Sequence, residues 1–66
     1  MKMYAMETVD GKVFTWHQPD VKLFIPSDDK SSLEVHLTDG KVETFEDPEL
    51  IYIRDDKDQD TILWEK

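Results

Sequence analysis

The sequence predicts an all-β fold, either a small barrel or a two-sheet sandwich of six to seven short antiparallel strands. Three observations favour this class. Short runs of β-branched and aromatic residues recur along the chain, Asp-Gly pairs separate two of these runs from their neighbours, and no segment has the length and period of a helix. Closing the sheet would also remove its edges, which otherwise invite pairing with other chains.

The 66 residues form a single domain near the lower size limit for independent folding, with no cysteine for disulfides or thiolate metal sites. A domain of this size buries only about 60% of the surface that its unfolded chain exposes. The seven aromatic residues argue against a disordered chain, because each ring can bury about 150–250 Å². We therefore expect an ordered domain, and we favour core positions for Trp16 and Trp64 over the alternative of exposed positions in an interface.

An internal repeat relates residues 4–29 to residues 33–58 at a constant offset of 29. Seven residues of the first segment recur in the second, namely Asp10, Gly11, Lys12, Val13, Thr15, Pro19 and Asp29. A duplicated unit explains this pattern, and the alternative is that two β-hairpins converged on the commonest turn residues. Under duplication, each unit is a three-stranded meander, and a pseudo-twofold axis relates the two units.

Each unit is expected to provide three strands, and a seventh strand follows them. In chain order the predicted strands cover residues 4–9, 12–16, 21–25, 33–38, 41–45, 50–54 and 61–65. Asp-Gly joins the first two strands of each unit, because glycine supplies the positive φ that a tight hairpin turn requires. The seventh strand is expected to pair with the sixth. Residues 28–32 connect the units, while residues 18–20 and 46–50 could each form one helical turn with proline near its start.

Two registers are possible for the first hairpin. A two-residue turn at Asp10-Gly11 would place Met6 opposite Thr15, whereas a three-residue loop with Gly11 in a bulge would place Met6 opposite Phe14. We favour the second register because it also sets Tyr4 opposite Trp16 and so gathers four large apolar side chains on one face. The same register in the second hairpin sets Leu33 opposite Phe45 but moves Val42 off the core face, so one register need not serve both hairpins.

The net charge of −8 is unevenly distributed along the sequence. Residues 1–33 carry five acidic and four basic residues, whereas residues 34–66 carry eleven acidic and four basic residues. Such a chain is repelled by phosphate backbones and by anionic lipid surfaces, which disfavours direct binding to nucleic acid or to a membrane. The partner that this field favours is a basic protein surface.

The leading hypothesis is therefore a non-catalytic, acidic protein-binding module. One specific form of it is an inhibitor that imitates the phosphates of nucleic acid and acts on a nucleic-acid-binding protein. The acidic face predicted to bind consists of Glu34, Glu43, Glu46, Asp47, Glu49, Asp55, Asp56, Asp58 and Asp60. The alternative is a self-associating structural or assembly domain, since a small core and open strand edges both favour a homo-oligomer.

Other chemistry has little support in the sequence. Asp56, Asp58 and Asp60 have the alternate spacing of a calcium-binding loop, but Thr61 replaces the required glycine and no bidentate glutamate follows. The two histidines, His17 and His36, have no spacing that predicts a zinc site, and we expect His36 on an outer face beside Glu34. The serines lie in polar connections without a histidine motif. We predict no enzymatic activity, no metal and no cofactor.

The absence of cysteine, of an apolar spanning segment and of a signal peptide together favour a cytoplasmic location. In size and composition the chain is similar to small bacterial and phage accessory proteins.

Overall fold

The structure is a computed structural model that describes residues 2–66. In this range it contains the seven strands β1 (Met3–Thr8), β2 (Val13–His17), β3 (Val21–Pro26), β4 (Ser32–Leu37), β5 (Val42–Glu46), β6 (Pro48–Arg54) and β7 (Asp60–Glu65). A single 3₁₀ turn, η1 (Gln18–Asp20), joins β2 to β3. The all-β prediction and the pairing of β7 with β6 are therefore confirmed.

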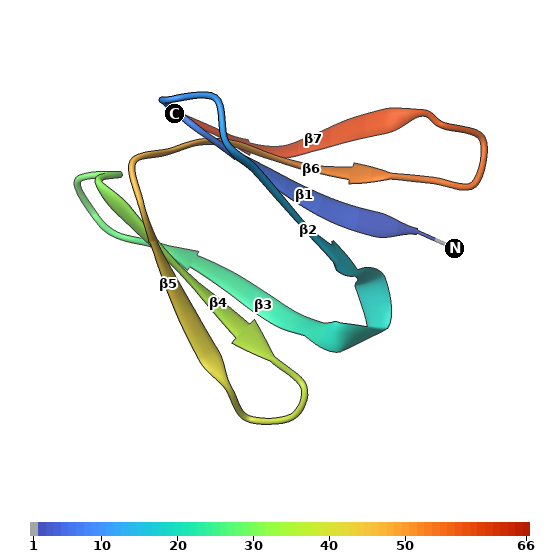
Figure 1. Cartoon of the computed structure of the whole chain (residues 1–66), viewed down its shortest axis with the longest axis horizontal. Coiled ribbons are helices and arrows are strands. Elements are labelled where there is room, and N and C mark those ends of the chain that lie inside the picture. The colour runs from blue at the N-terminus through green and yellow to red at the C-terminus, as the bar shows by residue number, and fades with distance from the viewer. Residues whose placement is uncertain (1) are drawn as a thin grey trace.

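The strands form two antiparallel sheets. In Figure 1 the sheet with β1, β2, β6 and β7 lies above the sheet with β3, β4 and β5. Sheet A has the order β2-β1-β6-β7, and sheet B has the order β3-β4-β5. The predicted barrel is wrong, because β2 and β7 remain edges of sheet A while β3 and β5 remain edges of sheet B, so the sheets do not close on themselves. Two facing sheets are compatible with a sandwich-like fold.

The third strand of each predicted unit joins the sheet of the other unit. β3 pairs with β4 rather than with β2, and β6 pairs with β1 rather than with β5. The predicted meanders are therefore wrong. The connection from β2 to β3 turns through η1, and this turn carries β3 away from the edge of its own hairpin. Each sheet consequently contains strands from both halves of the sequence.

The pairing of the third strands does not follow the constant offset of 29. Met6 and Val35, which are 29 residues apart, pair with Ile51 and Phe24, which are 27 residues apart. The cause is the length of the preceding connection: three residues of η1 link β2 to β3, whereas Asp47 alone links β5 to β6. Pro19 and Pro48, which align in the sequence, therefore occupy different structural positions. The duplication itself stays a prediction.

The two hairpins share one register, and it is the register with the glycine bulge. Met6 lies opposite Phe14, Tyr4 opposite Trp16, and Leu33 opposite Phe45. In both turns glycine has a positive φ, 88° at Gly11 and 93° at Gly40. The preferred register is thus confirmed for the first hairpin. It also serves the second hairpin, at the expected cost that the side chain of Val42 is 50% exposed.

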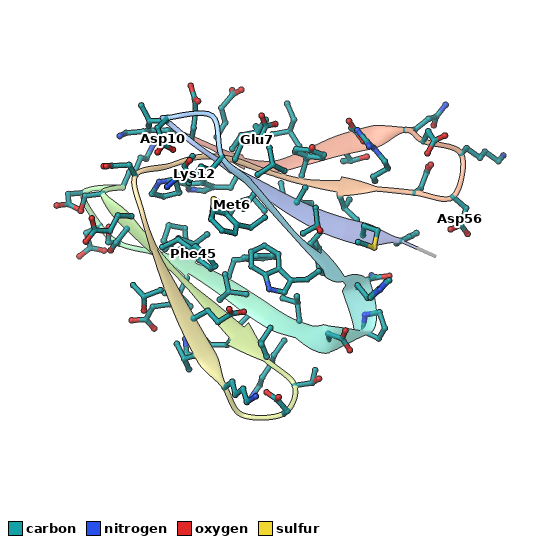
Figure 2. The ribbon with its side chains drawn as sticks, in the orientation of Figure 1. Met6, Glu7, Asp10, Lys12, Phe45 and Asp56 are labelled. Atoms are coloured by element: carbon teal, nitrogen blue, oxygen red, sulfur yellow. The ribbon has the colours of Figure 1, made fainter. Side chains whose placement is uncertain are left out.

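The core lies between the sheets and is centred on the inner strands. Met6 from β1, Leu33 and Val35 from β4, and Ile51 from β6 are buried together. Figure 2 shows Met6 and Phe45 in the space between the two sheets. Aromatic rings from both sheets surround this cluster, with centroids separated by 4.7 Å for Phe14–Phe45, 5.6 Å for Trp16–Phe45, 5.9 Å for Trp16–Phe24 and 5.2 Å for Tyr4–Phe24. The Phe14–Phe45 pair is tilted and the other three pairs are edge-to-face, and these contacts hold the two sheets together.

Both tryptophans pack against the core cluster, as predicted, and each keeps part of its side chain in solvent. The predicted helical turn at residues 18–20 is confirmed as η1. The one suggested at residues 46–50 is wrong. Asp47 adopts a φ of 53°, its N–H donates to the carbonyl of Ser31, and its own carbonyl accepts from Val9 N–H, so the chain passes directly from β5 into β6.

Candidate functional site

The nine acidic residues predicted to form one face lie in four separate places. Glu43 is on the inner face of sheet B, because it pairs with the buried Val35. Glu34 is next to Val35 on β4, so its side chain points to the outer face. Glu46, Asp47 and Glu49 surround the start of β6, whereas Asp55, Asp56, Asp58 and Asp60 lie in or beside the β6–β7 turn at its other end. A strand of seven residues separates the last two groups, so they do not share a surface.

Two carboxylates at the β6–β7 turn, Asp55 and Asp60, have structural roles. The side chain of Asp55 accepts hydrogen bonds from the N–H groups of Lys57 at 2.8 Å and Gln59 at 3.0 Å. Arg54 donates to both carboxylate oxygens of Asp60, at 2.8 and 3.1 Å, and this lowers the pKa of Asp60. These bonds account for two of the acidic residues as turn-forming groups.

Two other predicted residues are also paired within the chain. Glu34 and His36 contact each other at 2.9 Å on the outer face of β4, as expected for His36. The indole N–H of Trp16 donates to Glu43 at 3.1 Å, so this carboxylate fixes an aromatic side chain that connects the sheets. Neither carboxylate has an acidic neighbour across the β4–β5 ladder.

Six carboxylates do gather at one end of the molecule. We define the acidic end as Glu7, Asp10, Glu46, Asp47, Glu49 and Glu65. Glu7 and Glu65 flank Leu50 in one row across β1, β6 and β7, and Asp47 is joined to the β1–β2 turn by the 2.9 Å bond from Val9 N–H. Figure 2 shows Glu7 and Asp10 at this end and Asp56 at the far end of sheet A.

A groove opens at the acidic end, between the edge strands β2 and β5. It has a volume of about 410 Å³. Phe14 and Phe45 form its apolar part, and Asp10, Glu46 and Asp47 line it together with Lys12. Lys12 lies 3.8 Å from Asp10, so one basic group faces three acidic ones. The arrangement combines aromatic surface with a negative rim.

The carboxylates of this end suit ionic contacts. The hydroxyl of Thr8 donates to Asp10 and lowers the pKa of that carboxyl. A lowered pKa keeps the group ionised at neutral pH, whereas a general acid requires a raised one. Lys12 and Lys66 lie beside the acidic end, so the six carboxylates and these two lysines together carry a formal charge of −4, half of the net charge of the chain.

Three members of the acidic end, Glu7, Asp10 and Glu65, were not among the predicted site residues. The sequence suggested that the acidity belonged to the second half of the chain. In the structure, Glu7 and Asp10 come from the first half and meet Glu46, Asp47 and Glu49 only because β6 pairs with β1. No local signal in the sequence reports that pairing.

Within residues 2–66, no group of three or more histidine, cysteine, aspartate or glutamate side chains is arranged to hold a metal ion. Over the same described range, the chain has no helix of sufficient length and apolarity to cross a membrane. Comparisons with protein-family models, with curated proteins and with solved structures find no match. The fold and the site thus define an all-β domain of two antiparallel sheets with an acidic end.

Proposed function

We propose that this chain is a non-catalytic protein-binding module that recognises a positively charged protein surface through its acidic end. The observation that carries the proposal is the convergence of three carboxylates from both halves of the chain, Asp10, Glu46 and Asp47, around a groove with the aromatic rings of Phe14 and Phe45. The other three members of the acidic end, Glu7, Glu49 and Glu65, line a second hollow beside Leu50. A cysteine-free composition supports a cytoplasmic site of action.

Charge and apolar surface have different tasks in this proposal. Exposed ion pairs contribute only about 0.2–1 kcal/mol each, so the six carboxylates act mainly by steering a basic partner and excluding acidic ones. Affinity must then come from buried area, and the groove supplies it if a partner places an apolar or arginine side chain over Phe14 and Phe45.

An inhibitor that imitates nucleic acid remains a specific form of this proposal. Of the nine residues predicted from the sequence, Glu46, Asp47 and Glu49 belong to the acidic end and are the ones that such a mechanism would use. Affinity capture from a lysate, with and without nuclease, tests this form. A captured partner released by added DNA supports imitation, and a partner that DNA does not displace contradicts it.

The binding surface itself is tested with a synthetic peptide rich in lysine and arginine, added to ¹⁵N-labelled protein. We expect the largest amide shifts at residues 9–12 and 46–49, and weaker binding at higher salt because the Debye length falls from about 10 Å at 0.1 M to about 3 Å at 1 M. Shifts confined to residues 55–60 would contradict the assignment.

A pair of matched variants separates local from global charge. Glu46→Gln with Glu49→Gln removes two charges from the acidic end, and Asp20→Asn with Asp28→Asn removes the same number from η1 and the β3–β4 turn. We expect the first pair to weaken peptide binding at least about threefold more than the second, since screened charges act over roughly one Debye length. Equal effects would show that only net charge matters.

A further inference from the structure

Among residues 2–66, no strand pairs with the outer edge of β2. Thr8 N–H bonds to the carbonyl of Lys12, and Gln18 N–H bonds to the carbonyl of Lys2. These two bonds show which residues of β2 are hydrogen-bonded to β1, because such residues alternate along an antiparallel ladder. The N–H and C=O groups of Phe14 and Trp16 point towards β1. The N–H and C=O groups of Val13, Thr15 and His17 therefore point away from β1, and all three side chains are exposed.

The other three edges carry features that discourage pairing. β3 contains Lys22 at a register shift and ends at Pro26. β5 carries Glu43 on its inner face and Glu46 at its end. β7 has acidic residues at both ends, and its pairing with β6 shifts register between Ile51 and Tyr52. Charges, proline and bulges of this kind are the usual protection of edge strands.

β2 has none of these features. Its sequence, VFTWH, contains no acidic residue and no proline, and its ladder with β1 has no register shift. Figure 1 shows β2 on the side of sheet A away from β7. Among the four edges that the described residues form, β2 is the neutral and regular one, so in a chain with a net charge of −8 a second copy can approach it without opposing like charges along the strand.

We propose that β2 pairs with β2 of a second copy, antiparallel and around a twofold axis at Thr15. In this register Thr15 faces its own counterpart, Val13 faces His17, and Phe14 faces Trp16. All three outward-pointing backbone positions are then used, and every facing pair is free of like charge. Sheet A continues across the axis into a sheet of twice its width.

The position of Thr15 on the axis allows a charge-complementation test. Thr15→Lys alone and Thr15→Glu alone each place like charges opposite each other, and we expect each variant to raise the dimer dissociation constant at least about tenfold. An equimolar mixture places lysine opposite glutamate and is expected to restore dimers that contain one copy of each variant. Sedimentation velocity measures all three samples, and circular dichroism verifies that each variant is folded.

Thr44 provides the matched control, because it occupies on β5 the position that Thr15 occupies on β2. Thr44→Lys and Thr44→Glu are expected to leave the dimer intact. A single added strand buries less than a standard interface, so concentrations up to about 1 mM are included. A wild-type chain that is monomeric throughout, a dimer insensitive to Thr15, or a dimer lost only with the Thr44 variants would each overturn the proposal.

Salt distinguishes this proposal from the proposed function. Two copies of a chain with a net charge of −8 repel, and each brings Glu43 close to the strand pair through its bond with Trp16. Screening should therefore strengthen the dimer between 50 mM and 0.5 M NaCl, whereas binding of a basic partner should weaken over the same range. Dimerisation that weakens with salt would contradict pairing through β2, whatever the outcome of the peptide experiment.

Discussion

Single buried side chains carry much of the stability of this small domain. Met6, Leu33, Val35 and Ile51 come from the three strands that have neighbours on both sides, β1, β4 and β6. Leu33 and Val35 have no exposed surface. A domain of this size has a total stability of roughly 3–10 kcal/mol, so the loss of one such side chain removes a large fraction of it.

Two leucines of sheet B test this directly. Leu33→Ala empties a fully buried position and is expected to destabilise the fold by about 2–5 kcal/mol. Leu23 is 40% exposed, and Leu23→Ala is expected to cost less than about 1 kcal/mol. Urea denaturation followed by tryptophan fluorescence gives both values. Similar costs for the two variants would contradict a core centred on Leu33.

Among the turns, the β3–β4 connection is organised by one carboxylate. The hydroxyls of Ser31 and Ser27 donate to Asp29 at 2.7 and 2.8 Å, and the N–H of Ser31 donates to it at 3.1 Å. These bonds, the one from the Ser31 hydroxyl foremost, lower the pKa of Asp29 from its ordinary 3.8 to about 2. This turn, residues 27–31, connects the first half of the chain to the second half.

This shift has a defined pH dependence. Because the folded state holds Asp29 ionised more strongly than the unfolded state does, its contribution to stability is complete above pH 3.8 and is lost as the pH falls towards about 2. ¹³C NMR titration of the carboxyl is expected to give a midpoint near 2. In the double variant Ser27→Ala with Ser31→Ala, the midpoint should return towards 3.8, and an unchanged midpoint would show that the hydroxyls are not the cause.

The hairpins were predictable from sequence because their signals are local. Asp10-Gly11 and Asp39-Gly40 mark the two turns, and the register followed from placing Met6 opposite Phe14. β3 and β6 each join the sheet of the other half of the chain. This exchange of β3 and β6 was not predictable, because no residue near Val21 or Pro48 indicates which distant strand β3 or β6 will pair with. The acidic end depends on that exchange. For this reason only three of the nine carboxylates predicted from the sequence, Glu46, Asp47 and Glu49, belong to the acidic end.

For the molecule as a whole, the exchange makes each half depend on the other. β1 needs β6 and β4 needs β3 as neighbours, and the buried cluster combines Met6 with Leu33, Val35 and Ile51. Neither half contains a complete sheet with a complete core. Stability is therefore a property of the entire chain and not of two units joined by a turn.

Fragments provide the test. Division between Lys30 and Ser31 gives residues 1–30 and residues 31–66, and we expect each fragment alone to lack a dispersed amide spectrum because its central strand has lost a neighbour. On mixing, the fragments should associate and recover the tryptophan emission spectrum of the intact chain. If either fragment folds alone, the halves are independent and this account of the exchange is wrong.

The pairing of Met3 with Arg54 also has a consequence for biosynthesis. β1 leaves the ribosome before its inner neighbour β6, which begins only at Pro48. Until β6 is made, the nascent β1–β2 hairpin exposes Met6 and the aromatic side chains of Phe14 and Trp16. Contacts between segments so distant in sequence slow folding to the range of milliseconds to seconds, so this domain acquires its final structure late and nearly all at once.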